Sequence, residues 1–242
     1  MNDIETKGLT KRFKEKTAVD GLDLTVKQGE LFALLGVNGA GKTTTIKMLS
    51  GLLVPTAGAA KVLGYDLTAQ LPEIKQRIAV SPQETAVAPN LTVRENLELI
   101  AGIYGSSRAR AREKTAALLD ELHMQEVAKS RAKTLSGGWQ RRLSIAMALI
   151  SEPRLLFLDE PTLGLDVLAR RELWQVIRSL KGRVTVILTT HYLEEAEALA
   201  DRVGIMASGR LLHCGTPREL MDLAGEEKFE DAFVKLAGGE VQ

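Results

Sequence analysis

The stretch LFALLGVNGAGKTTTIKML, residues 31–49, joins an apolar run, a glycine-rich turn and a helix-like segment. Its middle matches the phosphate-loop pattern G-x-x-x-x-G-K-[ST], with Gly36, Gly41, Lys42 and Thr43 in the required places. The glycines let the backbone wrap around phosphate groups, the lysine supplies a positive charge, and the threonine hydroxyl suits Mg²⁺. An ordinary glycine-rich turn with a surface lysine is the alternative. The strand before the loop and the helix after it favour a nucleotide phosphate site.

Strand-like and helix-like segments alternate on both sides of this loop. Short apolar runs such as residues 155–158 and 184–190 are typical of buried parallel strands, and helical spacing follows each of them. This alternation predicts an α/β fold, a P-loop ATPase core with a mostly parallel sheet. The first 30 residues show strand patterns separated by Gly and charged turns, which predict an N-terminal antiparallel β subdomain.

Residues 90–150 differ from the rest, because three consecutive segments there have the spacing of amphipathic helices. We therefore expect a helical insert, or helical subdomain, at 90–150. The ATP-binding core is expected to comprise 1–89 and 151–225, with the β subdomain at about 1–30. Residues 226–242 are expected to form a short C-terminal helix or tail.

A second candidate anion site lies in LSGGWQRR, residues 135–142. Ser136 can cap a helix, and Gly137 and Gly138 leave backbone N–H groups bare at a helix start, where the helix dipole favours negative charge. A capped helix start without a ligand is the alternative.

Two acids end the apolar run in RLLFLDEP, residues 154–161. Ligand-binding groups gather at the carboxyl ends of parallel strands. Asp159 is therefore expected to hold Mg²⁺ through its water shell, and Glu160 to polarise an attacking water molecule. Because neighbouring strand residues point to opposite faces, the two acids are expected to have different roles. An acidic strand end that caps the next turn is the alternative.

Composition excludes several classes of protein. The 242 residues include 32 Lys and Arg against 31 Asp and Glu, a net charge of +1, so there is no bulk attraction to nucleic acid or anionic lipid. The apolar runs are shorter than the roughly 18 residues of a membrane-spanning helix. Cys214 is the single cysteine, so no internal disulfide forms and a reducing compartment such as the cytosol is expected.

Four segments, GVNGAGKTT, LSGGWQRR, LLFLDEP and TTH, occur in this order, and together they resemble the ATPase subunits of ABC transporters from about residue 4 to residue 238. The resemblance implies ATP and Mg²⁺ as cofactors and a head-to-tail homodimer in the ATP-bound state. It also implies an integral membrane permease partner that docks near residues 84–105, and a peripheral location at the cytoplasmic face of the cell membrane. TTHYLEEAEALADRVGIM and GRLLHCGTPREL are similar to the exporter branch.

The resemblance also implies roles for individual residues. Catalytic roles fall to Glu160, His191 and Gln83, and Mg²⁺ contacts to Thr43, Gln83 and Asp159. ATP contacts fall to Phe13, Gly36, Asn38, Gly39, Ala40, Gly41, Lys42, Thr43 and Thr44, and, in trans from the opposite subunit, to Ser136, Gly137, Gly138 and Asp166.

Two aromatic residues need separate mention. Phe13 stands where the family places an aromatic ring on adenine, with a core strand residue as the alternative. Trp139 stands where the family usually has Gln. Because it shares a helical face with Leu143, Ala146 and Ile150, we expect it to pack against the helical insert or the permease and not to contact ATP.

Two other functions compete with a transport ATPase. One is a soluble ABC-type ATPase that acts on nucleic acid or ribosomes without a permease. The single cassette, the absence of a heptad run and the near-zero charge argue against it, so no nucleic-acid partner is expected. The other is a nucleotide sensor that does not hydrolyse ATP, against which Glu160 and His191 argue.

Overall fold

The larger of two β-sheets carries the phosphate loop. The computed structural model describes residues 1–238, and its six-stranded sheet has the order β11-β10-β4-β9-β8-β7. The strands are β4 (Leu31–Leu35), β7 (Ile78–Ser81), β8 (Leu155–Asp159), β9 (Thr185–Thr190), β10 (Arg202–Ala207) and β11 (Arg210–Gly215). Every neighbouring pair is parallel except β10 and β11. The predicted α/β fold with a mostly parallel sheet is confirmed.

The second sheet is antiparallel and is built around one long strand. Its strands are β1 (Asn2–Phe13), β2 (Lys16–Leu22), β3 (Thr25–Lys27), β5 (Ala57–Val62) and β6 (Tyr65–Asp66). β1 pairs with β2, β3 and β5, and β6 pairs with β5. The antiparallel sheet predicted at the N-terminus therefore exists, and it extends beyond residues 1–30 because β5 and β6 join it.

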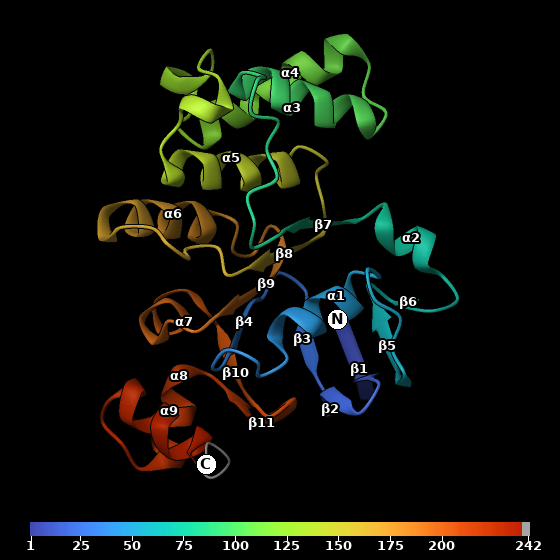
Figure 1. Ribbon diagram of the computed structural model, residues 1–242, viewed down its shortest axis with the longest axis vertical. Coiled ribbons are helices and arrows are strands. Elements are labelled where there is room, and N and C mark those ends of the chain that lie inside the picture. The colour runs from blue at the N-terminus through green and yellow to red at the C-terminus, as the bar shows by residue number, and fades with distance from the viewer. Residues whose placement is uncertain (239–242) are drawn as a thin grey trace.

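Helices cover both ends of the molecule. They are α1 (Lys42–Leu49), α2 (Leu71–Lys75), α3 (Val93–Ile103), α4 (Arg108–Glu121), α5 (Gly137–Leu149), α6 (Val167–Ser179), α7 (Leu193–Leu199), α8 (Pro217–Ala224) and α9 (Phe229–Ala237). Figure 1 shows α3, α4 and α5 gathered at one end and α8 and α9 at the other. None of the helices within residues 1–238 is long and apolar enough to cross a membrane. Residues 239–242 of the expected C-terminal tail lie outside the described residues.

Most of these helices begin at residues that cap them. Ser107, Ser136 and Asp166 precede α4, α5 and α6, and each side chain accepts a hydrogen bond from a backbone N–H of the first turn. Capping boxes start α3 and α8, through Thr92 with Glu95 and Thr216 with Glu219. The short helix α2, which begins beside a proline, was not expected from the sequence.

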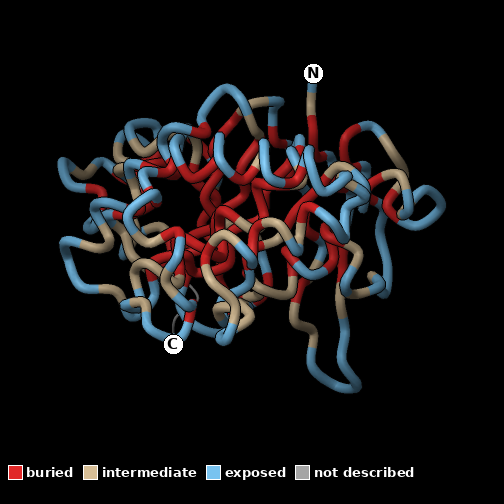
Figure 2. Tube along the Cα trace, turned by 90° about the horizontal axis from the view of Figure 1, so that it is seen from above, coloured by how far each residue is buried: buried red, intermediate tan, exposed pale blue. Residues whose placement is uncertain are grey.

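The central strands β4, β8 and β9 of the six-stranded sheet are buried on both faces, which explains their uninterrupted apolar runs. On β4, Leu31, Ala33 and Leu35 join one core cluster, together with residues of α5 to α9. Phe32 and Leu34, which point the opposite way, join a second cluster with α1 and the antiparallel sheet. The result is three layers: helices, the large sheet, and α1 with the small sheet. Figure 2 shows the buried segments running through the middle of the molecule.

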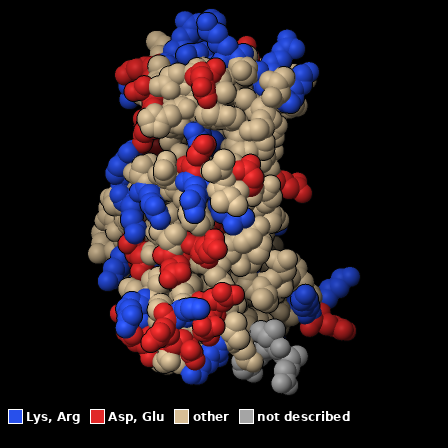
Figure 3. Space-filling view, turned by 90° about the vertical axis from the view of Figure 1, so that its left-hand side faces the viewer, with Lys and Arg blue, Asp and Glu red and all other residues tan. Residues whose placement is uncertain are grey.

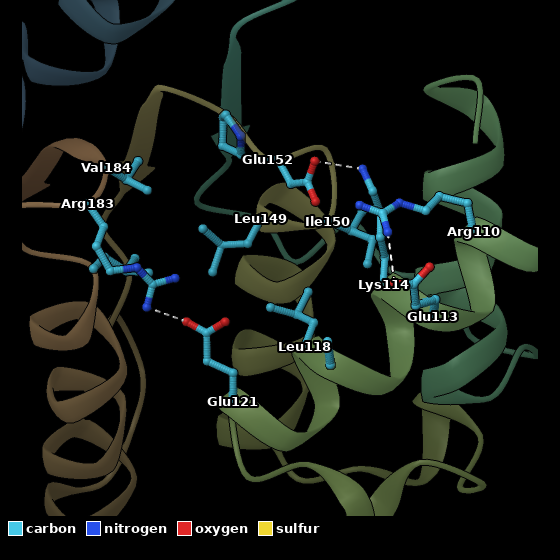
Figure 4. Close-up of a pocket in the computed structure, with 13 residues that line it drawn as sticks. Arg110, Glu113, Lys114, Leu118, Glu121, Leu149, Ile150, Glu152, Arg183 and Val184 are labelled. Atoms are coloured by element: carbon cyan, nitrogen blue, oxygen red, sulfur yellow. Dashed lines mark hydrogen bonds and ion pairs between the residues drawn. The ribbon is translucent and has the colours of Figure 1, made fainter. Parts of the chain in front are cut away.

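A cleft lies where α4 meets the loops that precede β8 and β9. Its floor is apolar, and two ion pairs cross it, Lys114 with Glu152 at 2.9 Å and Arg183 with Glu121 at 2.7 Å. Figure 4 shows Leu118, Leu149 and Ile150 between the two pairs. Such exposed ion pairs contribute only about 0–1 kcal/mol each to stability. The apolar contacts beneath them therefore contribute most of the free energy that holds α4 against these loops.

Surface charge is mixed over most of the face shown in Figure 3, and Lys and Arg gather toward its upper end, over the helical part of the molecule. The basic residues at the start of α4, including Arg108, Arg110 and Arg112, are exposed. This distribution agrees with a net charge near zero.

Candidate functional site

The loop between β4 and α1 forms an anion cradle. Gly41 precedes α1 with a φ of 102°, and a Cβ atom there would lie 2.5 Å from the carbonyl oxygen of Ala18, so only glycine fits. The N–H groups of Lys42, Thr43 and Thr44 belong to the first turn, where no carbonyl within the helix can accept from them. These donors and the helix dipole suit a phosphate group.

Lys42 is buried beneath this cradle. Its Nζ atom donates to the carbonyl oxygens of Gly36, at 2.7 Å, and Val37, at 3.3 Å. The same atom lies 3.3 Å from Oε1 of Glu160, which follows β8. The predicted phosphate lysine and the predicted catalytic acid therefore form an ion pair in this structure.

A cavity of about 370 Å³ opens over the loop. Predicted residues that line it come from four separate segments: Asn38, Gly39, Ala40, Gly41, Lys42, Thr43 and Thr44 from the loop, with Gln83, Glu160 and His191. Lys16 and Ala18 of β2 and Leu163 also line it, and the sequence analysis missed them. Lys16 and Ala18 belong to no motif, and only the packing of the small sheet beside the loop reveals them, whereas Leu163 lies in the loop between Glu160 and α6.

Asp159 ends β8 directly beside Thr43. Its Oδ1 atom accepts hydrogen bonds from Oγ1 of Thr43, at 3.0 Å, and from Oγ1 of Thr189, at 2.6 Å. Mg²⁺ prefers oxygen ligands of this kind. The donor set therefore fits the magnesium site that the sequence predicts.

The expectation that Asp159 and Glu160 alternate along one strand is wrong. β8 ends at Asp159, and Glu160 has a φ of 49°, in the left-handed region that non-glycine residues seldom adopt. The N–H of Glu160 donates to Thr189, to the carbonyl oxygen at 3.1 Å and to Oγ1 at 3.0 Å. The two carboxylates are therefore separated because the backbone turns at Glu160, where Thr189 holds it by hydrogen bonds, and not because side chains alternate along a strand.

Glu160 is held from two sides. Besides its ion pair with Lys42, its Oε2 atom lies 2.6 Å from Nδ1 of His191, which follows the end of β9. The carboxylate is buried, whereas the imidazole ring is partly exposed at the cavity. Three segments far apart in the sequence thus meet at one carboxylate, which lies at the cavity where it could act as a general base.

The residues predicted to act in trans are not among those that line the cavity. Ser136 caps α5 and accepts from the N–H of Trp139 at 3.5 Å. Asp166 caps α6 and accepts from the N–H groups of Leu168 and Ala169, both at 2.9 Å. Each cap stabilises its own helix, and a contact with a second molecule stays a prediction.

Phe13 and Trp139 occupy different environments. Phe13 is 46% exposed at the end of β1, with Nζ of Lys11 5.2 Å from its ring centroid, so it is not a core residue. Trp139 is partly buried against the larger core cluster, and the guanidinium of Arg142 lies 4.5 Å from its ring centroid. Trp139 does not line the cavity of its own chain, and whether it contacts ATP or the permease stays a prediction.

Comparison with known proteins places these features in context. A family model described as ABC transporter matches residues 19–163. The chain is 46% identical to a daunorubicin/doxorubicin resistance ATP-binding protein of Streptomyces peucetius, over 92% of this chain and 68% of that protein. It is 42% identical to the probable multidrug ABC transporter ATP-binding protein YbhF of Escherichia coli, over 96% of this chain but only 41% of that protein.

A solved structure shows the same fold. The chain is similar to a dimer of the ATP-binding cassette MJ0796 in a post-hydrolysis state, bound to ADP and Pi. The TM-score is 0.78 and the identity 25%, over 88% of this chain and 98% of the other.

Proposed function

This chain belongs to the ABC transporter family, whose ATP-binding domains hydrolyse ATP, and from that membership we propose that it is the ATPase subunit of an exporter. Two copies bind Mg²⁺ and ATP between them in head-to-tail order, and hydrolysis drives a separate membrane permease. The observation that carries the proposal is the position of Glu160, ion-paired to Lys42 and hydrogen-bonded to His191 at the cavity above the phosphate loop.

The residues have separate tasks in this proposal. The N–H groups at the start of α1 and the ammonium group of Lys42 bind the phosphates of ATP. Thr43, Asp159 and Gln83 hold Mg²⁺, which when bound neutralises negative charge on the phosphate oxygens. Glu160 accepts a proton from the attacking water, and His191 keeps that carboxylate oriented. Phe13, exposed beyond the loop, supplies an aromatic face for adenine.

The second half of each ATP site comes from the partner copy. Ser136, Gly137 and Gly138 at the start of α5, with Asp166 at the start of α6, contact the nucleotide held by the other chain. Support comes from their place outside the cavity of their own chain and from the dimer of the MJ0796 cassette. A helix start with bare glycine N–H groups is suited to a terminal phosphate.

The permease docks near residues 84–105, between a core formed by 1–89 and 151–225 and a helical subdomain formed by 90–150. The exposed side chains of Leu99 and Ile103 on α3, and of Tyr104 directly after it, support this placement. The subunit is then peripheral, on the cytoplasmic face of the cell membrane. Export as the direction follows from the two relatives, which are named for drug resistance and multidrug transport.

The test is the Glu160→Gln variant, which keeps the size of the side chain but cannot accept a proton. We expect ATP hydrolysis to fall at least about a hundredfold while ATP binding persists, and the variant to elute as a dimer with Mg²⁺ and ATP. Glu197→Gln, an exposed position on α7, is the control and should behave as wild type. A variant that stays monomeric at saturating ATP contradicts the head-to-tail dimer, and one that hydrolyses normally contradicts the catalytic role.

A further inference from the structure

Arg141 makes an unusual set of contacts from within α5. Its Nε atom donates to the carbonyl oxygen of Pro161 at 2.8 Å, and its Nη2 atom to that of Asp159 at 2.7 Å. Its Nη1 atom donates to the carbonyl oxygens of Pro82 and of Gln83, the latter at 3.2 Å. One guanidinium group thus binds four backbone carbonyls from two segments that both lead to the ATP cavity.

The side chain of Arg141 is closed off from solvent. Arg141 is only 4% exposed, and none of the ion pairs within residues 1–238 includes it. Burial lowers its pKa, while the nearby charges of Asp159, Glu195 and Glu160 oppose that shift. Because a buried guanidinium is costly unless its donors are satisfied, the four carbonyl bonds hold the group in one orientation.

The four carbonyls lie at informative positions. Those of Asp159 and Pro161 bracket Glu160, whose left-handed backbone needs support from its surroundings. Those of Pro82 and Gln83 fix the start of the loop that brings Gln83 to the cavity. The two residues expected to manage the attacking water are therefore positioned against a single side chain.

Arg141 also lies close to the start of α5. Ser136 caps that helix, and Arg141 follows it by five residues, about 7.5 Å along the axis. We propose that Arg141 is a positioning residue that sets Glu160 and Gln83 relative to the first turn of α5. This inference rests on the proposed function, in which that first turn contacts the ATP of the partner chain. Arg141 then ties the hydrolysis site of one chain to the site that its helix completes on the other.

The next residue of the same helix provides a matched control. Arg142 is also buried, but its guanidinium pairs with Glu172 of α6 at 2.9 Å and stacks over Trp139. No hydrogen bond or ion pair described for Arg142 reaches the segments of Gln83 or Glu160 within residues 1–238. A loss of helix packing would affect both arginines, whereas a loss of positioning would affect only Arg141.

The experiment compares Arg141→Lys and Arg141→Gln with Arg142→Lys and Arg142→Gln. Lysine keeps the charge but lacks the planar fork of donors. We expect both Arg141 variants to lose at least tenfold in kcat while the Kd for ATP stays within threefold of wild type. Both Arg142 variants should keep kcat within threefold. Wild-type kcat in Arg141→Lys, or an equal loss in Arg142→Lys, would overturn the inference.

A double-mutant cycle tests whether Arg141 acts partly by positioning the loop that carries Gln83. If Arg141 acts partly through Gln83, adding Arg141→Lys to Gln83→Ala should reduce kcat by less than it does in the wild type. Fully multiplicative losses would contradict that route. Failure of this inference is distinguishable from failure of the proposed function, because the latter shows as normal hydrolysis by Glu160→Gln, whatever the Arg141 variants do.

A measurement on the unmodified chain applies if the Arg141 variants do not fold. The Nε–H signal of Arg141 in a nitrogen-proton NMR spectrum should exchange slowly with solvent, and it should shift when Mg²⁺ and a non-hydrolysable ATP analogue are added. The Nε–H signal of Arg142 should not shift. Rapid exchange of the Arg141 signal, or no response to nucleotide, would overturn the inference.

Discussion

The Nδ1 atom of His191 lies 2.6 Å from Oε2 of Glu160. The strands that precede these residues, β8 and β9, are adjacent and parallel, so both residues leave the sheet at the same edge. This hydrogen bond holds one carboxylate oxygen, and the ion pair with Lys42 holds the other, so that together they fix the orientation of the carboxylate. His191 is thus placed to orient the base, and it has no need to touch the attacking water.

Replacing His191 by Ala should therefore lower kcat by roughly ten- to a hundredfold, because the carboxylate remains at the cavity but loses the partner that orients it. The Kd for ATP should change little, since the phosphate cradle is built from α1. Steady-state hydrolysis and ATP titration measure the two effects separately. His213→Ala on β11, outside the residues that line the cavity, serves as the control. A loss in ATP affinity as large as the loss in kcat would contradict an orienting role.

Lys42→Ala removes the ion-pair partner of the other carboxylate oxygen of Glu160. The ammonium group is the one buried cation described at the cavity within residues 1–238, and a charged hydrogen bond contributes about 1.5–3 kcal/mol. ATP affinity should fall roughly ten- to a hundredfold, and hydrolysis should be lost. Lys47→Ala, exposed on the same helix, should bind ATP as wild type does. Normal ATP affinity in Lys42→Ala would refute the assigned phosphate contact.

Glu195, on α7, gives a prediction about stability and pH. It is fully buried, and Nε1 of Trp174 donates to its Oε1 atom at 3.0 Å. Burial raises its pKa above the ordinary 4.5, and the nearby charge of Glu160 adds to the rise. Above pH 4.5 the unfolded chain loses this proton while the folded chain keeps it. The free energy of unfolding therefore falls as pH rises from 4.5 to the folded pKa, and this contribution is constant beyond it.

Glu195→Gln removes that titration while keeping the shape of the side chain. The stability of the variant relative to wild type should increase as pH rises above 4.5 and then level off. Urea unfolding at a series of pH values from 4.5 to 8.5 measures the difference. Glu194→Gln, at the exposed neighbouring position, should show no such increase. Parallel pH profiles for wild type and Glu195→Gln would show that burial does not shift this pKa.

Local patterns predicted most of the architecture because each depends on neighbours in sequence. The apolar run before Gly36 and the glycines up to Gly41 predict strand, loop and helix together, since glycine alone tolerates the conformation that the loop requires. The uninterrupted apolar runs of β4 and β8 are equally local. Helix starts at Ser136 and Asp166 follow from capping chemistry.

Contacts between distant segments could not be predicted in this way. No pattern indicated that Lys16 would line the cavity, or that Arg141 would bind the carbonyl oxygens beside Glu160. The left-handed backbone of Glu160 was missed because the apolar run that ends in two acids carries no signal that the strand stops at the first acid, Asp159. These features depend on which elements pack together, which only the assembled sheets determine.

The glycine pair at the start of α5 separates a structural from a functional requirement. A Cβ atom on Gly138 would lie 3.0 Å from Cβ of Ala169 on α6, so Gly138→Ala should cost roughly 1–3 kcal/mol of stability. At Gly137 the nearest atom lies 3.9 Å away, so an alanine fits, and its helix propensity should stabilise the chain by up to about 0.5–1 kcal/mol. Among residues 1–238, nothing that the structure describes requires glycine at 137.

Gly137→Ala should nevertheless lose most ATP hydrolysis, because the methyl group stands where the phosphate of the partner's ATP approaches the bare N–H groups. Binding of ATP to the chain's own phosphate loop should persist, while the dimer formed by Glu160→Gln should be lost in the combined variant Gly137→Ala, Glu160→Gln. Gly102→Ala, in open space on α3, is the control and should be stable and active. Thermal melting, ATP titration and size-exclusion chromatography measure these outcomes. A fully active Gly137→Ala chain would mean that the start of α5 makes no close contact with nucleotide.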